Sequence, residues 1–301
     1  MLRVLLVGCG DIALRTAALL RGRVRLYGLT RRADDVPRLR AQGILPIVAD
    51  LDRSDSLRQL RTAPWGVLHF APPPAEGRDD PRTRHLVAAL SSARIIPQRL
   101  VYVSTSGVYG DCAGARVDET RPRRAGTPRA RRRVAAETTL RAWSVRNGVS
   151  LAILRVPGIY AEGRLPLERI RHGTPVLAAD DDVYTNHIHA DDLAQAVVAA
   201  LFRGRPNRAY NVTDDAELRM GNWFDAVADA YRLPRPPRIG WEEAERRIAP
   251  QLLSFMNESR RLANRRMKRE LRVALRYPEP AALLARIAPR EPKKQLALPL
   301  G

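Results

Sequence analysis

The stretch LRVLLVGCGDIA, residues 2–13, decides the fold class. An apolar run ends in a Gly-Cys-Gly turn, and a helical pattern of apolar residues follows it to residue 20. Gly8-Cys9-Gly10-Asp11-Ile12-Ala13 fits the G-x-G-x-x-G/A pattern of a strand-to-helix turn. In that pattern the first glycine permits the turn, the second lets the backbone approach a pyrophosphate, and the small third residue lets the helix pack on the strand. We therefore predict dinucleotide phosphates on the N–H groups that open the helix.

Strand and helix patterns alternate after this turn. Apolar or β-branched runs predict strands at 24–30, 44–51, 66–72, 99–110 and 150–160, and amphipathic patterns predict helices at 34–42, 81–94 and 128–146. Such alternation is typical of an α/β protein with a Rossmann-like, doubly wound parallel sheet.

The pattern changes beyond residue 160. We expect a helix at 190–202, a short strand at 208–212, and helical segments at 221–232 and 241–272. The prediction is a small C-terminal cap subdomain, mainly from 160–185 and 213–285, within a dinucleotide-binding domain of residues 1–288. Residues 289–301 are expected to form a flexible tail.

Composition limits the class of protein. The chain has 301 residues, of which 45% are hydrophobic and 28% charged, as in an ordinary globular protein. We find no apolar run near the ~20 residues of a membrane helix, so no membrane partner is expected. The only cysteines, Cys9 and Cys112, exclude a disulfide framework and a four-cysteine zinc site. We expect a cytoplasmic protein.

The chain is strongly basic, with a formal net charge of +20 and a pI of 11.2. Nearly all of this charge is arginine, because the only lysines are Lys268, Lys293 and Lys294. The arginines are spread along the chain, which favours a solvated basic surface over specific nucleic-acid binding. Non-specific attraction to polyanions at low salt is expected from the charge alone.

The end of the second predicted strand bears on the choice of coenzyme. A site that prefers NAD usually places an acidic residue there for the ribose 2′-hydroxyl. This chain has Thr30-Arg31-Arg32 instead. Guanidinium groups bind phosphate as a fork, which favours NADP over NAD. The alternative is that both arginines are solvated residues at the start of a helix.

Several stretches in order resemble one family. They are GCGDIA, Asp50-Leu51, VYVSTSGVYG, LRVPGIYAEGR, NHIHADDLAQAV, AYNVTDD and ESRRLANRRMKREL followed by Tyr277-Pro278. Over residues 1–285 the chain resembles the extended short-chain dehydrogenase/reductases, the superfamily of the NAD-dependent epimerase/dehydratases, as an atypical member.

The resemblance implies roles for particular residues. Asp50 and Leu51 would flank the adenine, Ala71 and Pro72 would lie near the coenzyme ribose, and Thr105 would bind a substrate oxygen. Pro157, Gly158 and Ile159 would line the nicotinamide. The expected cofactor-binding set is Gly8, Gly10, Asp11, Ile12, Arg31, Arg32, Asp50, Leu51, Ala71, Pro72, Pro157, Gly158 and Ile159. No metal site is expected, because His187 and His189 lack a third ligand on their predicted loop.

The family's proton-transferring pair is missing. Its Tyr-x-x-x-Lys falls on Arg129 and Arg133, and no tyrosine lies between Tyr109 and Tyr160. Arg133 can still reach ribose hydroxyls, but the guanidinium of Arg129 stays protonated and offers no acceptor. Thr105, Arg129 and Arg133 are therefore the catalytic positions with an altered pair. Asp111, Glu119 and His85 are candidate substitute acids, and the sequence does not choose among them.

The tail carries a separate motif. Residues 295–300, QLALPL, resemble the hexapeptide by which bacterial replication proteins dock on the DNA sliding clamp. Gln295 would form a hydrogen bond, while Leu296, Leu298, Pro299 and Leu300 would fill an apolar groove. The alternative is that these leucines pack back on the body of the protein.

Two functions from different classes remain. The first is an NADP-binding oxidoreductase or epimerase-like enzyme that acts on an unidentified small molecule with an atypical proton donor. The second is a catalytically weak nucleotide-binding scaffold or sensor, docked on the sliding clamp through its tail. Relatives of this family often dimerise through the helices expected here at 81–94 and 128–146, so a homodimer is also expected.

Overall fold

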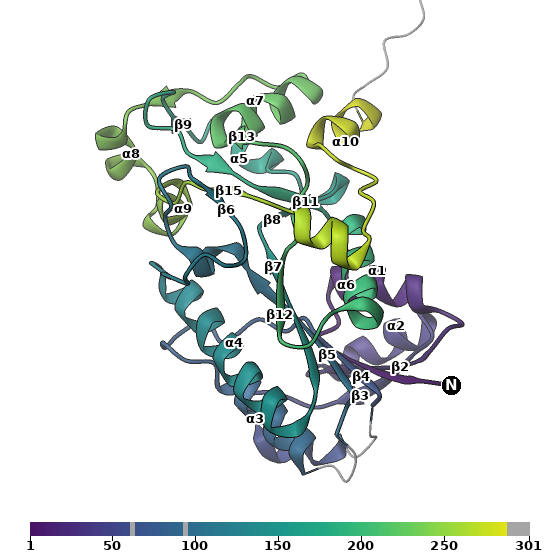
Figure 1. Ribbon diagram of the computed structural model, residues 1–301. Helices are drawn as coiled ribbons and strands as arrows, with labels where there is room; N and C mark the ends of the chain where they lie inside the picture. Colours follow the sequence, from purple (N-terminus) through teal and green to yellow (C-terminus); the bar gives the residue numbers. More distant parts are fainter. Residues whose placement is uncertain (61–63, 93–95, 288–301) are drawn as a thin grey trace, which may run out of the picture.

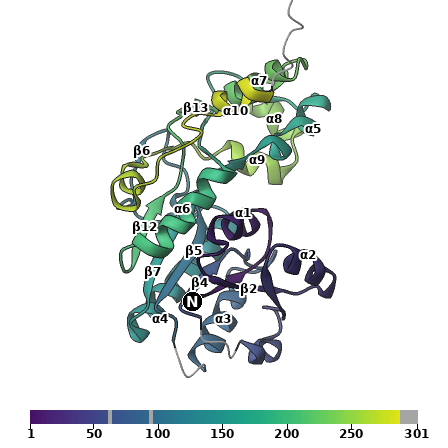
Figure 2. The ribbon, with the colours of Figure 1, turned by 90° about the vertical axis from the view of Figure 1, so that its right-hand side faces the viewer.

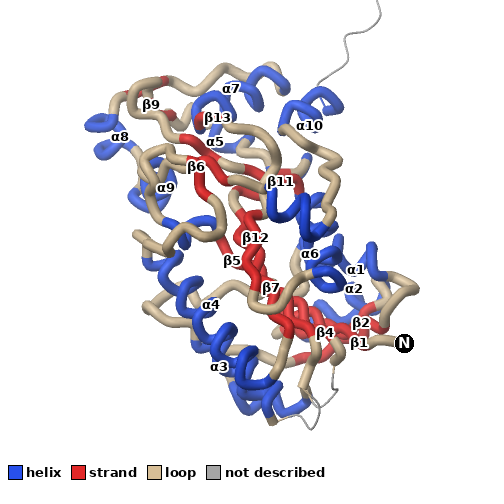
Figure 3. The backbone as a smooth tube through the Cα atoms, in the orientation of Figure 1, coloured by secondary structure: helices blue, strands red, loops and turns tan. Residues whose placement is uncertain are grey.

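A parallel sheet of seven strands forms the centre of the molecule (Figures 1 and 3). The computed structural model describes residues 1–60, 64–92 and 96–287. The strand order is β12-β7-β5-β4-β1-β2-β3. These strands are β1 (Arg3–Val7), β2 (Arg25–Thr30), β3 (Ile44–Val48), β4 (Gly66–His69), β5 (Arg99–Thr105), β7 (Ser150–Val156) and β12 (Arg208–Asn211). The predicted Rossmann-like fold class is confirmed.

Helices cover both faces of the sheet, because its strands are apolar on both sides. One face packs against α1 (Asp11–Leu20), α2 (Val36–Ala41) and α6 (Ala190–Arg203). The other packs against η2 (Ser54–Gln59), α3 (Pro81–Ser91) and α4 (Pro128–Asn147), with Trp143 among the buried residues. None of the described helices has both the length and the apolar character needed to span a bilayer.

The strand order reverses between β1 and β4. The chain adds β2 and β3 on one side of β1, then crosses to β4, β5, β7 and β12 on the other. The helices that follow β1 and β4 therefore leave on opposite faces, which opens a crevice at the carboxyl ends of these two strands. Ligands of open α/β sheets bind at such a point.

Short elements form a cap beyond the carboxyl ends of the strands, opposite the N-terminus (Figure 2). Its strands are β6 (Arg116–Val117), β8 (Gly158–Tyr160), β9 (Val176–Leu177), β10 (Tyr184–Thr185), β11 (His187–His189), β13 (Leu218–Arg219), β14 (Arg238–Ile239) and β15 (Arg261–Leu262). Its helices are α5 (Leu167–Arg171), α7 (Met220–Ala230), α8 (Trp241–Arg247), α9 (Pro250–Met256) and α10 (Pro280–Ile287). The remaining turns are η1 (Ala33–Asp35), η3 (Ser106–Tyr109), η4 (Glu162–Arg164) and the π-helical turn η5 (Met267–Leu271).

Two predictions about this region are wrong. The expected helix at 241–272 is broken into α8, α9, β15 and η5, because Pro250 starts a new helix and residues 257–260 are not helical. His187 and His189 lie on strand β11, paired in parallel with β8, and not on a loop. Both imidazoles are buried, and burial lowers the pKa of His187 to about 4.

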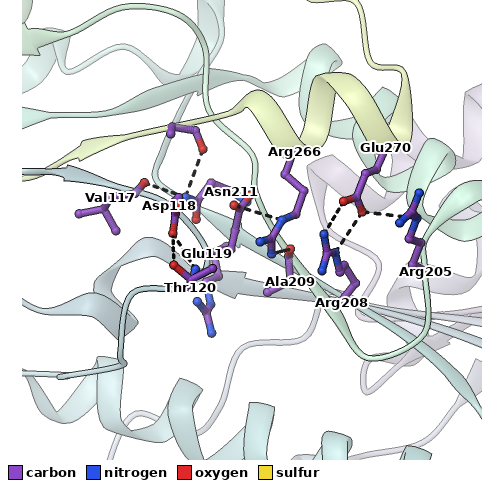
Figure 4. A network of polar contacts seen from close by, with 12 residues as sticks. Val117, Asp118, Glu119, Thr120, Arg205, Arg208, Ala209, Asn211, Arg266 and Glu270 are labelled. Carbon is purple, nitrogen blue, oxygen red and sulfur yellow. Dashed lines mark hydrogen bonds and ion pairs between the residues drawn. The ribbon is translucent and has the colours of Figure 1, made fainter.

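A network of charges covers the edge strand β12 (Figure 4). The Glu119 carboxylate accepts a 2.8 Å hydrogen bond from the backbone N–H of Asn211, and it pairs at 3.4 Å with Arg266. Arg266 also donates to the carbonyl of Ala209. These contacts occupy backbone groups that an edge strand would otherwise expose, and they attach the C-terminal segment to the sheet.

Candidate functional site

A cleft of about 890 Å³ lies at the point where the strand order reverses. It runs from the turn after β1, across the ends of β2 and β3, to the ends of β5 and β7. Of the predicted site residues, those that line it are Gly8, Gly10, Asp11, Ile12, Arg31, Arg32, Asp50, Leu51, Ala71, Pro72, Thr105, Arg133, Pro157 and Ile159. The fold brings these distant positions to one cavity.

The two glycines of the first turn differ in their surroundings. Gly8 has φ +89°, and a Cβ there would lie 2.8 Å from the backbone nitrogen of Ala71, so only glycine fits without strain. A Cβ on Gly10 would meet nothing within 4 Å, which leaves the approach to α1 open. Gly10 is the N-cap of α1 and no side chain caps that helix. The free N–H groups suit a pyrophosphate.

Asp11 brings a negative charge to the same turn. Its carboxylate accepts hydrogen bonds from Arg15 at 2.8 Å and from Arg164 at 3.1 Å. Burial would raise the pKa of Asp11, but these two arginines lower it overall, so the group is ionised and paired. Arg164 comes from η4, far along the chain, and also lines the cleft. The pairing reduces the repulsion that a diphosphate would meet beside Asp11.

Two arginines lie beside one carboxylate at the end of β2. Arg38 pairs with Asp35 at 3.1 Å and donates to the Cys9 carbonyl, while Arg32 lies 3.6 Å from Asp35. The Thr30 hydroxyl donates to Asp35 at 2.8 Å, and this bond together with the arginines lowers the pKa of Asp35. Arg31 is exposed at the rim, and arginines outnumber aspartates among the residues that line this end of the cleft.

The opposite end of the cleft carries hydroxyl groups from the end of β5. The Thr105 hydroxyl accepts a hydrogen bond from the backbone N–H of Gly107, so its own proton is free to be donated. Ser104 donates at 2.8 Å to Glu137, which is fully buried on α4. Glu137 also accepts two hydrogen bonds from Arg155. This bonded cluster fixes the floor of the cleft.

Arg133 stands at the position of the family's lysine and lines the cleft. Its guanidinium donates to the Val103 carbonyl at 3.0 Å and to the Tyr102 hydroxyl at 3.1 Å. Tyr102 is fully buried, does not line the cleft, and burial raises its pKa to about 12. Only one nitrogen of Arg133 is used by these bonds, so other donors remain for a ligand.

Arg129, at the position of the family's tyrosine, is not a lining residue of the cleft. Its guanidinium lies over the Phe255 ring of α9, 4.0 Å from the ring centre. A cation–π contact with the cap holds this side chain there, so the structure does not bring Arg129 together with the other predicted site residues. Gly158 does not line the cleft either: its strand pairs with β11, beside His187.

The three candidate substitute acids also lie outside the cleft lining. Asp111 accepts hydrogen bonds from the backbones of Ala113 and Ser259. Glu119 belongs to the β12 network, and His85 contacts the Leu51 carbonyl. All three groups are engaged in hydrogen bonds within the protein, and the structure does not bring them together with the residues that line the cleft.

Sequence reasoning missed several residues that line the cleft. They include Cys9, Thr30, Asp35, Arg38, Phe70, Arg82, Ser104 and Arg164. The arginine at position 38 follows the predicted NADP-type Arg-Arg by one to two helical turns, which was a usable signal. No local pattern marked Arg164. The tail motif at 295–300 lies outside the described residues.

The model of the family described as "NAD dependent epimerase/dehydratase family" matches residues 13–213, about two thirds of the chain. The chain belongs to this family. This match confirms the resemblance to the extended short-chain dehydrogenase/reductases. Membership of the family supports dinucleotide binding as the general function.

Individual relatives agree with this placement. Human dTDP-D-glucose 4,6-dehydratase is 26% identical over 175 residues, covering 49% of each chain, so the chain spans about half the length of the curated relatives it matches. A protein of unknown function from Silicibacter pomeroyi is 29% identical, with a TM-score of 0.78 over 95% of this chain and 98% of that chain. The Bacillus anthracis dTDP-glucose 4,6-dehydratase in complex with NAD has a TM-score of 0.76 at 15% identity, over 95% and 96% of the two chains, which shows the shared fold.

Proposed function

We propose that this family member binds NADP and transfers hydride between the coenzyme and a small hydroxy or carbonyl compound, with a proton donor other than residue 129. The observation that carries the proposal is the single cleft that joins the uncapped end of α1, the arginines after β2 and the Thr105 hydroxyl. When bound, a nicotinamide coenzyme supplies the hydride donor or acceptor.

Residues at the two ends of the cleft would bind different parts of the coenzyme. The N–H groups of α1 would hold the diphosphate, and Arg31 and Arg32 would hold a 2′-phosphate with forked hydrogen bonds. Arg38 already contacts Asp35 and the Cys9 carbonyl, so its role would be to hold these groups in place and not to bind the coenzyme phosphate. Arg133 would donate to ribose hydroxyls with its remaining N–H groups.

Thr105 would orient the substrate oxygen. Its free O–H can donate to a carbonyl oxygen or an alkoxide, which stabilises charge that develops there during hydride transfer. The cationic Arg133 on the same end adds to this stabilisation. The proton that must reach the alkoxide is expected to come from solvent or substrate, since no carboxyl or imidazole group is among the residues lining this end of the cleft.

A second candidate is a dinucleotide-binding protein with little or no redox activity. The contact between Arg129 and Phe255 favours it, because the position that normally handles the proton is occupied by a cation that packs against the cap. The comparisons bring no support for the sliding-clamp part of this alternative.

The experiment that tests the proposal is a fluorescence titration with NADPH and NADH, followed by single-turnover hydride transfer to a panel of carbonyl compounds. We expect NADPH to bind at least tenfold more tightly than NADH, the effect of about 1.4 kcal/mol from the extra phosphate contacts. A protein that binds neither coenzyme would refute both candidates. Tight coenzyme binding without hydride transfer to any compound would favour the second candidate, a dinucleotide-binding protein with little or no redox activity.

A further inference from the structure

The end of the sheet opposite the cleft, where the strands begin, combines several arginines with exposed aromatic and apolar groups. The amino ends of the parallel strands lie at this end of the sheet, in the order β12-β7-β5-β4-β1-β2-β3. We call this end the basic pole. It consists of Arg3, Arg21, Arg23, Arg25, Arg203 and Arg205 together with Leu2, Trp65 and Phe202.

Contacts between neighbouring strands join these residues into one surface. Arg3 and Arg25 are register partners on neighbouring strands, and the Arg25 N–H donates to the Leu2 carbonyl. The Trp65 N–H donates to the Arg3 carbonyl, and the Trp65 ring stacks on Phe202, with ring centres 5.8 Å apart. Arg21 directly follows α1 and Arg203 belongs to the last turn of α6, and Figure 2 shows the N-terminus below these two helices.

The arginines at this pole are exposed and little neutralised. All six are exposed, and no carboxylate occurs in residues 12–33 or 193–213, which contribute most of them. Glu270 is the acidic group in contact here: it pairs closely with Arg208 and lies 3.9 Å from Arg205 (Figure 4). In contrast, the arginines of the cleft, such as Arg38 and Arg82, pair with aspartates. The six arginines of the basic pole are therefore less neutralised than Arg38 and Arg82 of the cleft.

Apolar groups lie exposed among these charges. Phe202 is 40% exposed and Leu2 42% exposed. The rings of Trp65 and Phe202 are held in place, because the Trp65 indole N–H donates to Gln98 and both rings sit at the ends of sheet or helix elements. Fixed rings beside guanidinium groups match the chemistry of single-stranded nucleic acid, whose phosphates bind arginine and whose bases stack on aromatic faces.

We propose that the basic pole is a binding surface for single-stranded nucleic acid, independent of the coenzyme cleft. A membrane surface would share the phosphate chemistry. However, Leu2 and Trp65 lie at strand ends, and Phe202 is in the last turn of α6, whose apolar face is buried against the sheet. An amphipathic helix with a free apolar face is the element that usually enters a bilayer interface. The sequence alone favoured a diffuse basic surface; the fold instead gathers these arginines at one end.

The test measures the binding of a dye-labelled single-stranded DNA of about twenty nucleotides by fluorescence anisotropy at several salt concentrations. The variant carries Arg3→Gln, Arg23→Gln and Arg25→Gln. Its matched control carries Arg171→Gln, Arg232→Gln and Arg246→Gln, which are exposed residues of the cap and remove the same charge. Unchanged NADPH binding and thermal stability show that both variants are folded.

We expect the pole variant to bind at least tenfold more weakly, and to lower the slope of log K against log salt by about 2, since three phosphate contacts at about 0.7 each are lost. The control should stay within about threefold of the parent protein. Equal weakening by both variants would overturn the proposal in favour of diffuse attraction.

Two further measurements separate the partner classes. Phe202→Ala should weaken single-strand binding about tenfold, while Phe202→Tyr retains it, because stacking needs the ring. If Phe202→Ala has no effect and duplex DNA binds equally well, base stacking is excluded and the proposal fails. If phosphatidylserine vesicles bind through the same arginines while single-stranded DNA does not, the surface is a membrane contact and the proposal is overturned.

Discussion

The guanidinium of Arg129 lies over the ring of Phe255, 4.0 Å from its centre, and so joins α4 to the cap helix α9. Arg133, one helical turn later, points instead into the cleft and bonds to the Val103 carbonyl. The two arginines that replace the family's catalytic pair thus serve different parts of the molecule. One contacts the cap and the other contacts the coenzyme cleft.

This difference predicts that only one of the two arginines affects coenzyme binding. Arg133→Ala should weaken NADPH binding about tenfold, as expected for the loss of charge-assisted hydrogen bonds worth about 1.5 kcal/mol. Arg129→Ala should leave the dissociation constant of NADPH nearly unchanged. Isothermal titration calorimetry of the two variants checks this, and the reverse order of effects would show that residue 129 faces the coenzyme.

Substitution of the two glycines of the first turn should have different effects, one on coenzyme binding and the other on the stability of the fold. Gly10→Ala adds a methyl group where nothing lies within 4 Å, so unfolding by urea should change little while NADPH binding weakens at least tenfold. Gly8→Ala places a Cβ 2.8 Å from a backbone nitrogen at φ +89°, and should destabilise the fold by about 1–3 kcal/mol. If Gly10→Ala binds normally, the coenzyme does not approach this turn.

The buried carboxylate under the cleft should matter more than the hydroxyl it holds. Glu137→Gln leaves the Arg155 guanidinium buried without a charged partner, and we expect a loss of about 3 kcal/mol in the free energy of unfolding. Ser104→Ala removes one of several hydrogen bonds to Glu137 and should cost about 1 kcal/mol. Urea denaturation monitored by circular dichroism compares the two. A larger effect for Ser104→Ala would contradict this ranking.

A buried aspartate in the cap makes stability depend on pH. Burial raises the pKa of Asp214 to about 8 in the native state, above its ordinary value of 3.8. Between these values the native state binds the proton more tightly than the unfolded state, so stability falls as pH rises, by roughly 4 kcal/mol from pH 5 to pH 8.

The variant Asp214→Asn should remove most of this slope and be more stable than the parent at pH 8. Asp180→Asn, at an exposed position, should keep the slope. Urea unfolding at both pH values checks the difference. A parent protein equally stable at pH 5 and pH 8, with no gain for Asp214→Asn, would show that Asp214 is ionised in the native state.

The fold was predictable because its signals are local. The run into Gly8 and Gly10 and the alternation of strands with helices each depend on neighbouring residues, and the structure confirms the sheet they predict. The approximate positions of Thr105 and Arg133 followed from the family resemblance. The direction of the side chain at 129 did not, because it depends on Phe255, which is more than a hundred residues away.

Contacts between distant segments explain the other differences. Arg164 meets Asp11 across 153 residues of sequence, and no periodicity marks such a pair. Gly158 sits within a family-like motif, yet its pairing with β11 places it outside the cleft. The predicted helix at 241–272 had the right composition, but Pro250 and the strand pairing of β15 with β6 divide it.

The ion pair between Asp11 and Arg164 also affects the conformation of the cleft before a ligand binds. It links the first turn of α1 to a turn of the cap, so it favours one separation of these two walls before a ligand arrives. Less conformational entropy then has to be lost when a dinucleotide enters, and more of the contact energy becomes available as affinity. This preorganisation comes from Asp11 and Arg164 on opposite walls of the cleft, while the sheet holds the two walls close enough for the side chains to pair.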